Sequence, residues 1–249
     1  MGMRLDKFLC EMNIGSRSQV KVFIRQGTVT VNDTPTTNPD QQIDEFSDRV
    51  AFRGKALQYR RFVYYMMNKP EGVVSASRDN TARTVVSLLG KDAREDIFPV
   101  GRLDKDVTGL LLLTNDGDLA HKLLSPKKHV DKTYRAVLEH VLLPEDIRRL
   151  ENGLDIGEEN LTLPARVTVL EERIILLTLH EGKFHQVKRM LQAVDNQVLQ
   201  LRRTAFGGLT LDPNLAPGEY RELSGEELET LRKSGGRKQK AQEETENET

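Results

Sequence analysis

The sequence predicts a mixed α/β protein of the α+β type, with more strand than helix, behind a small amino-terminal module. Two observations carry this prediction. From about residue 62 onward, short apolar runs typical of buried strands alternate with amphipathic segments of helical period. Residues 1–62 instead hold two short helical patterns and a hairpin, and they carry 10 Lys and Arg against 7 Asp and Glu in a chain of net charge −1. The 249 residues suffice for two unequal domains.

The front module begins with two helices. Apolar residues recur at helical spacing from Leu5 to Met12. Ser16, with Gln19 three residues later, predicts a capping box that starts a second helix, and Gly27 marks its end. A β-branched run and an Asn-Asp turn then predict a hairpin, over residues 28–31 and 32–35.

The larger part of the chain alternates strands with helices. Residues 58–61 form a plausible linker to it, and residues 68–72 contain a Pro-Gly turn. From residue 234 the chain is too polar to bury a core, which predicts a disordered tail over residues 234–249. We predict strands over residues 62–67, 97–100, 110–113, 133–138, 165–170, 174–179 and 198–203, and helices over residues 118–124, 144–152 and 186–194.

Several classes of protein are excluded at once. No run reaches the ~18 apolar residues of a membrane span, and the amino terminus is charged where a signal peptide is apolar, so we expect a cytoplasmic protein. The lone Cys10 excludes an intramolecular disulfide and a zinc site of paired cysteines, which leaves a core residue. Residues 104–115 and 180–185 approach calcium and zinc motifs but lack the ligand spacing. Nucleotide-binding and serine-hydrolase motifs are absent as well.

One loop holds a candidate for chemistry. Gly101-Arg102-Leu103-Asp104 follows a predicted strand directly, which places Asp104 on a strand-end loop beside apolar residues, a position where functional carboxylates are often held. Asp104 is therefore a candidate nucleophile or base. A turn aspartate that only hydrogen-bonds the backbone fits the same pattern, so the loop alone does not decide between the two.

The front module resembles a known RNA-binding domain. Arg4-Leu5-Asp6, then Ser16-Arg17, then the stretch GTVTVN at residues 27–32 are similar to the S4 domain. The resemblance implies that a basic helix face contacts RNA phosphates by shape and charge, without reading bases. Each of the implicated side chains also fits an ordinary solvated helix position. They are Arg4, Lys7, Arg17, Lys21 and Arg25.

The rest of the chain carries a second set of motifs. FPVGRLD at residues 98–104 runs into TGLLLLTNDG at 108–117, and NKPEG, KTY and EGKFHQVKRM follow the same order at 68–72, 132–134 and 181–190. Together they resemble the bacterial ribosomal RNA pseudouridine synthases of the RsuA, RluB, RluE and RluF group. The forms HQVKRM and LAPGEYR are most similar to the RsuA type, which acts on uridine 516 of 16S rRNA.

This resemblance implies an architecture. It consists of an S4-like domain over residues 1–57, the linker 58–61, and a catalytic domain over residues 62–233 whose central, mostly antiparallel mixed sheet is flanked by helices. The tail completes the chain. The expected partner is 16S rRNA within a small-subunit assembly intermediate, and the expected state is a monomer. Because isomerising uridine needs neither a redox change nor an external group, we expect no cofactor.

The resemblance also assigns roles to residues. Asp104 is the implied catalytic carboxylate, Tyr134 the ring over the flipped uracil, and Lys188 the cation that keeps Asp104 ionised. Arg102 is the implied wedge that occupies space near the displaced base. Lys183 and Arg189 are further RNA-contacting candidates and weaker choices than Lys188 for the ion pair. Whether Asp104 forms a covalent sugar adduct or removes the C2′ proton to give a glycal stays open.

Two other functions remain possible at this point. One is the same chemistry directed at a uridine of large-subunit (23S) rRNA, against which only the wording of the last two motifs stands. The other is a catalytically silent assembly factor of the S4 type, against which the presence of Asp104, Tyr134 and Lys188 argues.

Overall fold

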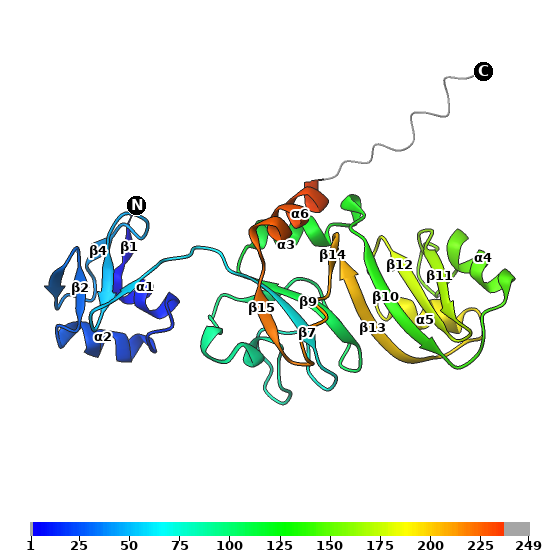
Figure 1. Ribbon diagram of the computed structural model, residues 1–249, viewed down its shortest axis with the longest axis horizontal. Coiled ribbons are helices and arrows are strands. Elements are labelled where there is room, and N and C mark those ends of the chain that lie inside the picture. The colour runs from blue at the N-terminus through cyan, green and yellow to red at the C-terminus, as the bar shows by residue number, and fades with distance from the viewer. Residues whose placement is uncertain (1, 237–249) are drawn as a thin grey trace, which may run out of the picture. The chain divides into compact units, whose positions relative to one another are not determined.

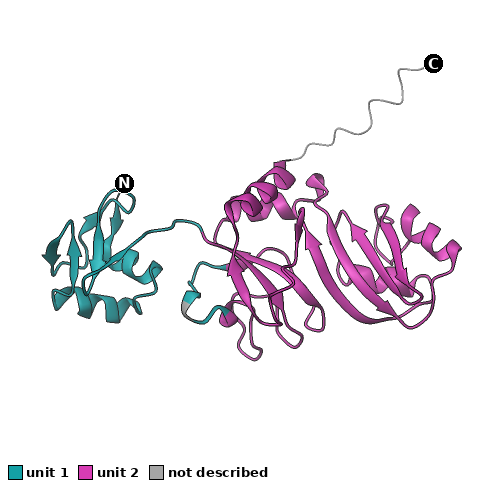
Figure 2. Cartoon of the chain, in the orientation of Figure 1, with its two compact units in different colours: residues 1–62, 89–97 teal, residues 63–88, 98–249 magenta. Residues whose placement is uncertain are grey.

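The computed structural model describes residues 2–236, and the chain divides into two compact units (Figure 2). Unit 1 comprises the residues up to 62 together with residues 89–97. Unit 2 comprises residues 63–88 and the chain from 98 onward. The segment 89–97 groups with unit 1 although both of its neighbours in sequence belong to unit 2, which nothing in the sequence pattern indicates.

Unit 1 contains the two predicted helices, α1 (Leu5–Glu11) and α2 (Arg17–Arg25). The capping box is confirmed, because the Ser16 hydroxyl accepts from the Gln19 N–H while the Gln19 side chain accepts from the Ser16 N–H. Apolar faces of both helices pack on the strands around a core that Cys10 borders, as predicted. The strands are β1 (Met3–Arg4) paired with β4 (Gln42–Ile43), and a sheet of β3 (Thr34–Thr36), β2 (Val29–Val31), β5 (Val50–Phe52) and β6 (Lys55–Leu57).

Unit 2 is built on one large mixed sheet, which confirms the predicted α+β class (Figure 1). Within the described residues every strand pairing in it is antiparallel except that of β13 with β9. Two short strands extend it, β14 (Leu209–Thr210) beside β13 and β8 (Phe98–Pro99) beside β9. The main order is β11 (Arg166–Glu171), β12 (Ile174–Leu179), β10 (Lys132–Leu138), β13 (Val198–Phe206), β9 (Thr108–Thr114), β7 (Tyr64–Lys69) and β15 (Tyr220–Glu222).

Helices cover this sheet. α3 (Gly117–Leu124) and α6 (Gly225–Gly236) lie side by side in Figure 1 and close an apolar core that includes Leu123, Leu231 and Phe206. The other helical segments are α4 (Pro144–Asn152), α5 (Gln186–Gln192), and the 3₁₀ turns η1 (Val86–Asp92) and η2 (Pro126–Lys128).

Most predicted elements are confirmed, and three predictions need correction. The strand predicted to end at 67 continues through Asn68 and Lys69, because the buried Lys69 ammonium donates to the carbonyls of Pro70 and Val107 and so tolerates the interior. The last predicted strand extends to residue 206. The tail predicted from 234 is helical up to residue 236, where the Ser234 hydroxyl donates to the Gly207 carbonyl. The rest of that tail lies outside the described residues.

Gly109 allows the two halves of the sheet to join. β9 and β13 meet as a parallel pair in which Gly109 lies beside Arg203. Gly109 has φ +102°, and a Cβ at this position would overlap the Arg203 carbonyl oxygen. Only glycine therefore permits this close backbone approach. The junction holds the loop before β9 against the strands β10 and β13.

Candidate active site

Unit 2 contains a pocket of about 590 Å³. Its lining comes from six places in the sequence: residues 74–75, the loop 101–107 between β8 and β9, the end of α3 with the start of η2, strand β10, the segment from the end of β12 into α5, and strand β13. Polar and apolar side chains share the lining, and the volume suits a ligand of small-molecule size.

The loop between β8 and β9 presents Asp104 to this pocket. β8 and β9 pair as a hairpin, so the loop leaves and re-enters the same edge of the sheet. Leu103 is buried, and its backbone N–H and C=O both bond the Ser75 hydroxyl, at 3.0 and 2.8 Å. The Val107 N–H bonds the Asp104 carbonyl at 3.1 Å. The backbone is thus fixed on both sides of Asp104, whose side chain is only 29% exposed.

Lys188 on α5 binds two carboxylates of that loop. Its Nζ lies 3.1 Å from Asp104 Oδ2 and 2.8 Å from each Asp106 carboxylate oxygen. Burial lowers the pKa of Lys188, but the hydrogen bonds to Asp106 and Asp104 outweigh burial, and the net shift is upward. The hydrogen bond from Lys188 lowers the pKa of Asp106. The ammonium therefore stays charged and favours the ionised form of Asp106.

Asp106 was not singled out from the sequence. The only signal was its place two residues after Asp104 in a loop, which is common among turn residues. Its carboxylate is 63% exposed, while that of Asp104 is turned into the pocket lining. Asp106 thus positions Lys188, and Asp104 is the carboxylate presented to a ligand.

His185 is a second residue that sequence reasoning did not place in the site. Its Nε2 lies 3.5 Å from Asp104 Oδ1. It occupies the left-handed region at φ 49° just before α5, and its ring stacks on that of Phe184 with 3.8 Å between centroids. Phe184 itself is 73% exposed and lines the pocket. The entrance to α5 therefore supplies both an imidazole near Asp104 and an exposed aromatic ring.

Strand β10 forms another part of the pocket wall. Tyr134 and Lys132, two residues apart, share one face of the strand and both line the pocket. Lys132 is 9% exposed, and its Nζ donates to the Val130 carbonyl at 2.9 Å. Burial and the neighbouring charge of Arg203 lower the pKa of Lys132 to about 8. Strand β10 therefore contributes both an aromatic and a cationic side chain to the pocket wall.

The other sequence-predicted residues of unit 2 differ in their placement. Arg102 is exposed and lines the pocket next to Asp104. Lys183 also lines it, but its ammonium donates to the carbonyls of Asn160 and Leu161. Arg189 instead bonds the Glu158 carboxylate at 2.5 Å and the Ile156 carbonyl. Lys183 and Arg189 thus stabilise the segment 156–161, whereas Asp104, Lys188, Tyr134 and Arg102 come together at one pocket.

In unit 1 the buried Asp6 organises the predicted basic residues. Arg4 donates two hydrogen bonds to Asp6 and a further one to Asp40. The hydrogen bond from Arg4 lowers the pKa of Asp6, although burial of the carboxylate acts in the opposite direction. Lys21 lies 3.9 Å from the same carboxylate, and Lys7 lies 3.6 Å from Glu11. The two remaining basic residues of the set, Arg17 and Arg25 on α2, are exposed.

The described part of the chain shows neither a metal cluster nor a membrane span. Across residues 2–236 no group of three or more His, Cys, Asp or Glu side chains is arranged to hold a metal ion. No helix in the same range has the length and apolar character to cross a membrane.

The chain is similar to known proteins in both sequence and fold. Residues 63–193 match the model of the RNA pseudouridylate synthase family, and residues 3–50 match that of the S4 domain. A solved structure described as a pseudouridylate synthase superposes with a TM-score of 0.66 at 36% identity, covering 92% of this chain and 99% of the other.

Curated relatives are matched over nearly their whole length. The Bacillus subtilis protein named uncharacterized RNA pseudouridine synthase YtzG is 48% identical over 92% of this chain and 98% of its own. A Vibrio cholerae protein named ribosomal small subunit pseudouridine synthase A is 41% identical over 92% and 99%. A Bacillus subtilis protein named ribosomal large subunit pseudouridine synthase B is 38% identical over 92% and 95%.

The pKa of Lys132 leads to a prediction about stability. Its pKa in the folded chain, about 8, lies below the ordinary 10.5, so the unfolded chain binds more protons between these values. Lys132 therefore makes the free energy of unfolding increase as the pH rises from 7.5 to 9.5. We expect a smaller rise in Lys132→Met than in the wild type, measured by urea unfolding at both pH values. Lys122→Met, which alters an exposed lysine of α3, should match the wild type. Equal rises in Lys132→Met and wild type would contradict the prediction.

Proposed function

The chain belongs to the RNA pseudouridylate synthase family, and on that premise we propose that it converts one uridine of small-subunit ribosomal RNA, uridine 516 of 16S rRNA, to pseudouridine. The observation that supports this proposal most is the pocket that Asp104, its ion-pair partner Lys188 and Tyr134 line together. The choice of small-subunit RNA is supported by the HQVKRM and LAPGEYR motifs and by the relatives named for that subunit. A large-subunit uridine is the alternative, since relatives named for that subunit are almost as similar.

The reaction detaches uracil and reattaches it through a different atom. The bond between C1′ of the ribose and N1 of the base breaks, and the electron pair stays with the base. The ribose is stabilised by Asp104, which either bonds C1′ or accepts the C2′ proton. The base then turns and C5 bonds C1′, while the bond from Asp104 to C1′ breaks or the proton returns to C2′. The C5 proton leaves, and N1 takes up a proton. No atom is gained or lost, so the chemistry calls for no cofactor.

Asp104 must be ionised for either role. The Lys188 ammonium, 3.1 Å from Asp104 Oδ2, supplies the opposite charge beside this partly buried carboxylate. Asp106 binds the other side of the same ammonium and so fixes its position. Lys188 thus acts on the substrate only through Asp104.

The uridine must leave the RNA stack before it can reach Asp104. Flipping a base out costs about a few kcal/mol, which contacts in the pocket must offset. Tyr134 offers a ring face for the flipped uracil and a hydroxyl for proton relay. Arg102, exposed at the pocket edge, is placed to occupy the space that the base vacates and to contact the RNA backbone.

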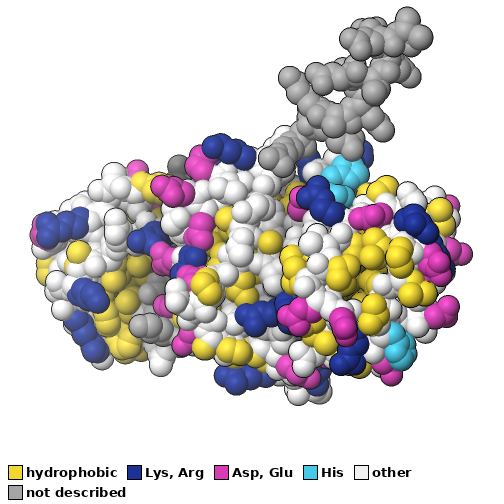
Figure 3. Space-filling view, turned by 45° about the vertical axis from the view of Figure 1, so that its right-hand side comes forward, with side chains coloured by type: hydrophobic (Ala, Val, Ile, Leu, Met, Phe, Trp, Pro, Cys, Tyr) yellow, Lys and Arg dark blue, Asp and Glu magenta, His cyan; other side chains and the backbone are white. Residues whose placement is uncertain are grey.

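RNA binding away from the pocket is assigned to the S4 domain. In this proposal residues 1–57 bind the RNA, and residues 58–61 link them to the catalytic domain, which comprises residues 62–233. On the face shown in Figure 3, Lys and Arg side chains alternate with Asp and Glu, in keeping with a net charge near zero. Local clusters must therefore supply the phosphate contacts. Because Asp6 and Glu11 hold Arg4, Lys21 and Lys7, the exposed Arg17 and Arg25 are the main candidates. We propose that the protein acts as a monomer, in the cytoplasm, on a small-subunit assembly intermediate.

Asp104→Asn is expected to abolish product formation while folding and RNA binding persist, because the amide keeps the shape of the carboxylate but cannot act as nucleophile or base. The measurement is carbodiimide mapping of pseudouridine in both ribosomal RNAs from cells that lack this gene. The cells are rescued with the wild type, with Asp104→Asn, or with Asp118→Asn, a control in the exposed first turn of α3.

Three outcomes separate the alternatives. The proposal is supported in full if one small-subunit site is lost, and if the wild type and Asp118→Asn restore it while Asp104→Asn does not. A large-subunit site with the same pattern would keep the chemistry and overturn the target. A cell that loses no pseudouridine would overturn the enzyme and favour the silent assembly factor.

A second prediction concerns the S4 domain. Replacing Arg17 and Arg25 together by Gln should weaken RNA binding and reduce the slope of log Kd against log salt by about 1.5, since each phosphate that is no longer neutralised lowers the slope by roughly 0.7–0.9. The measurement is a filter-binding titration at several salt concentrations. Arg49→Gln, which alters an exposed arginine paired with Asp33 in the same unit, should leave the slope unchanged. An unaltered slope in the double variant would contradict the assignment.

A further inference from the structure

Arg203 is a buried cation with an unused hydrogen-bond donor. It lies on β13 in the middle of the large sheet and is only 2% exposed. Its Nε donates to the Leu110 carbonyl at 2.8 Å. Its Nη2 is buried and has no hydrogen-bond partner, the one side-chain nitrogen or oxygen of residues 2–236 for which this holds.

No carboxylate among residues 2–236 forms a salt bridge with Arg203. Another cation lies near it: Lys132 Nζ and Arg203 Cζ lie 5.7 and 5.0 Å from the centroid of the same Phe206 ring. Burying a guanidinium with an unmet donor and no counter-ion is costly, and such a group requires an explanation. If the side chain at position 203 served only to donate a hydrogen bond to the Leu110 carbonyl, it would not have to be charged.

The strand register places Arg203 at the pocket. Arg203 is the direct partner of Tyr134 on β10 and lies beside Gly109 on β9. Directly opposed residues in an antiparallel pair project to the same face of a sheet, so Arg203 shares the face of Tyr134. Arg203, Lys132, Tyr134 and Asp104 all line the one pocket. Arg203 therefore belongs to the wall of the pocket that is proposed to receive the flipped uracil.

We propose that Arg203 is a further catalytic residue, whose Nη2 donates a hydrogen bond to a carbonyl oxygen of the uracil as the N-glycosidic bond breaks. This inference rests on the proposed function. When the bond between C1′ and N1 breaks, its electron pair enters the uracil ring, and the negative charge spreads to O2 and O4. The charge disappears when C5 bonds C1′, and the C5 proton then leaves as N1 takes one up. Arg203 transfers no proton in either step.

Burying the Arg203 guanidinium costs free energy in the free enzyme, but the same burial suits this role. A donor held in a dry environment binds an anion much more strongly than a neutral carbonyl, so it favours the cleaved state over bound uridine. The bond from Nε to Leu110 fixes the guanidinium plane in advance. The neighbouring Lys132 adds a second positive charge to the same wall. Asp104 stabilises the sugar that is left behind, and Arg203 stabilises the base that departs.

The test compares two RNAs that differ in how readily uracil leaves. Arg203→Gln retains an amide donor for the Leu110 carbonyl but removes Nη2 and the positive charge. Single-turnover rates of cleavage of the C1′–N1 bond, followed as loss of the N1-linked nucleoside, are measured on a small-subunit rRNA fragment that contains either uridine or 5-fluorouridine at the target. Cleavage is the common readout because 5-fluorouridine has no C5 proton to lose. Fluorine withdraws electrons from the ring and stabilises the departing anion, so cleavage of the fluorinated base depends less on the enzyme.

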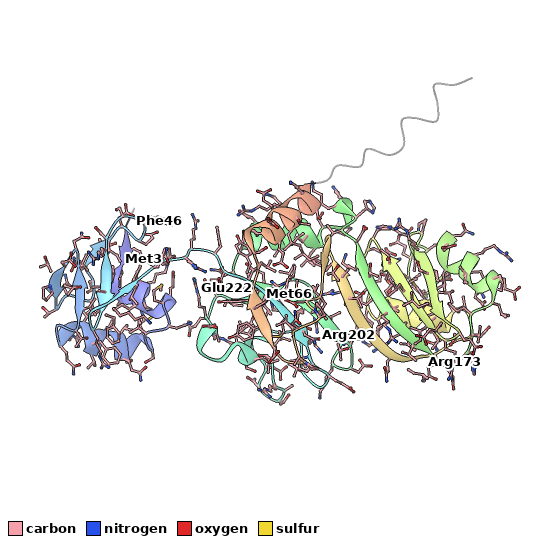
Figure 4. All side chains as sticks on the ribbon, in the orientation of Figure 1. Met3, Phe46, Met66, Arg173, Arg202 and Glu222 are labelled. Carbon is pink, nitrogen blue, oxygen red and sulfur yellow. The ribbon has the colours of Figure 1, made fainter. Side chains whose placement is uncertain are left out.

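We expect Arg203→Gln to lose about 100-fold in rate on the uridine RNA, the usual effect of removing one donor to a developing anion, and less than about 10-fold on the fluorinated RNA. Equal losses on the two RNAs, or a loss below about threefold on both, would overturn the inference. Arg202→Gln is the matched control, because Arg202, labelled in Figure 4, is the exposed neighbour on the other face of β13. It should lose less than twofold on either RNA. A wild-type protein inactive on the uridine RNA would count against the proposed function instead.

A second measurement does not depend on whether Arg203→Gln folds. In a crystal structure of Asp104→Asn bound to the uridine RNA, Arg203 Nη2 should lie within about 3.2 Å of uracil O2 or O4. A separation beyond hydrogen-bonding distance from both oxygens would overturn the inference, whatever the rates.

Discussion

The ammonium of Lys188, bound by Asp104 and Asp106, is the interaction on which the site depends. It joins α5, which follows β12, to the loop that follows β8, two segments more than 80 residues apart in the chain. The mixed sheet makes this meeting possible, because the parallel pair of β9 and β13 brings the loop before β9 next to the strands that carry Tyr134 and Arg203. Gly109 permits that pair, since a side chain there would overlap the backbone of β13. A small number of backbone constraints thus brings one carboxylate, its cation and an aromatic ring to the same pocket.

Elements that local interactions determine were predicted accurately, whereas elements that depend on contacts between distant segments of the chain were not. The capping box at Ser16, helix 144–152 and strand 174–179 were predicted with the bounds that the structure shows, because caps, prolines and local periodicity determine them. Strand β7 was predicted to end before Asn68, because a turn signal follows and a lysine is unusual in a buried strand. Carbonyls from a distant loop satisfy the Lys69 ammonium, and no local pattern reports such a contact. Helix α6 was not predicted, because its apolar face is short and its stability comes from packing on α3.

The candidate site divides in the same way. Asp104, Tyr134, Lys188 and Arg102 were found through motifs, and the structure places all four at one pocket. Asp106, His185 and Arg203 were missed, because their relevance lies in contacts with partners from other elements. For Arg203 the sequence shows only one of two adjacent arginines on a strand, and burial alone distinguishes it from Arg202. A charged residue in an apolar strand signals something unusual, but its partner can be identified only from the fold.

The most direct test of the central claim is to remove the charge that Lys188 places beside Asp104. Lys188→Met and Lys188→Arg are compared in single-turnover pseudouridine formation, with thermal melting of each variant as the check on folding. Methionine keeps the length of the side chain without the ammonium, and arginine keeps a permanent charge that can bridge two carboxylates. We expect the single-turnover rate to fall by about 100-fold or more in Lys188→Met, because the electrostatic contribution is removed. In Lys188→Arg, which retains the charge, we expect a fall below about 10-fold. A folded Lys188→Met that forms product at a rate close to that of the wild type would contradict the central claim.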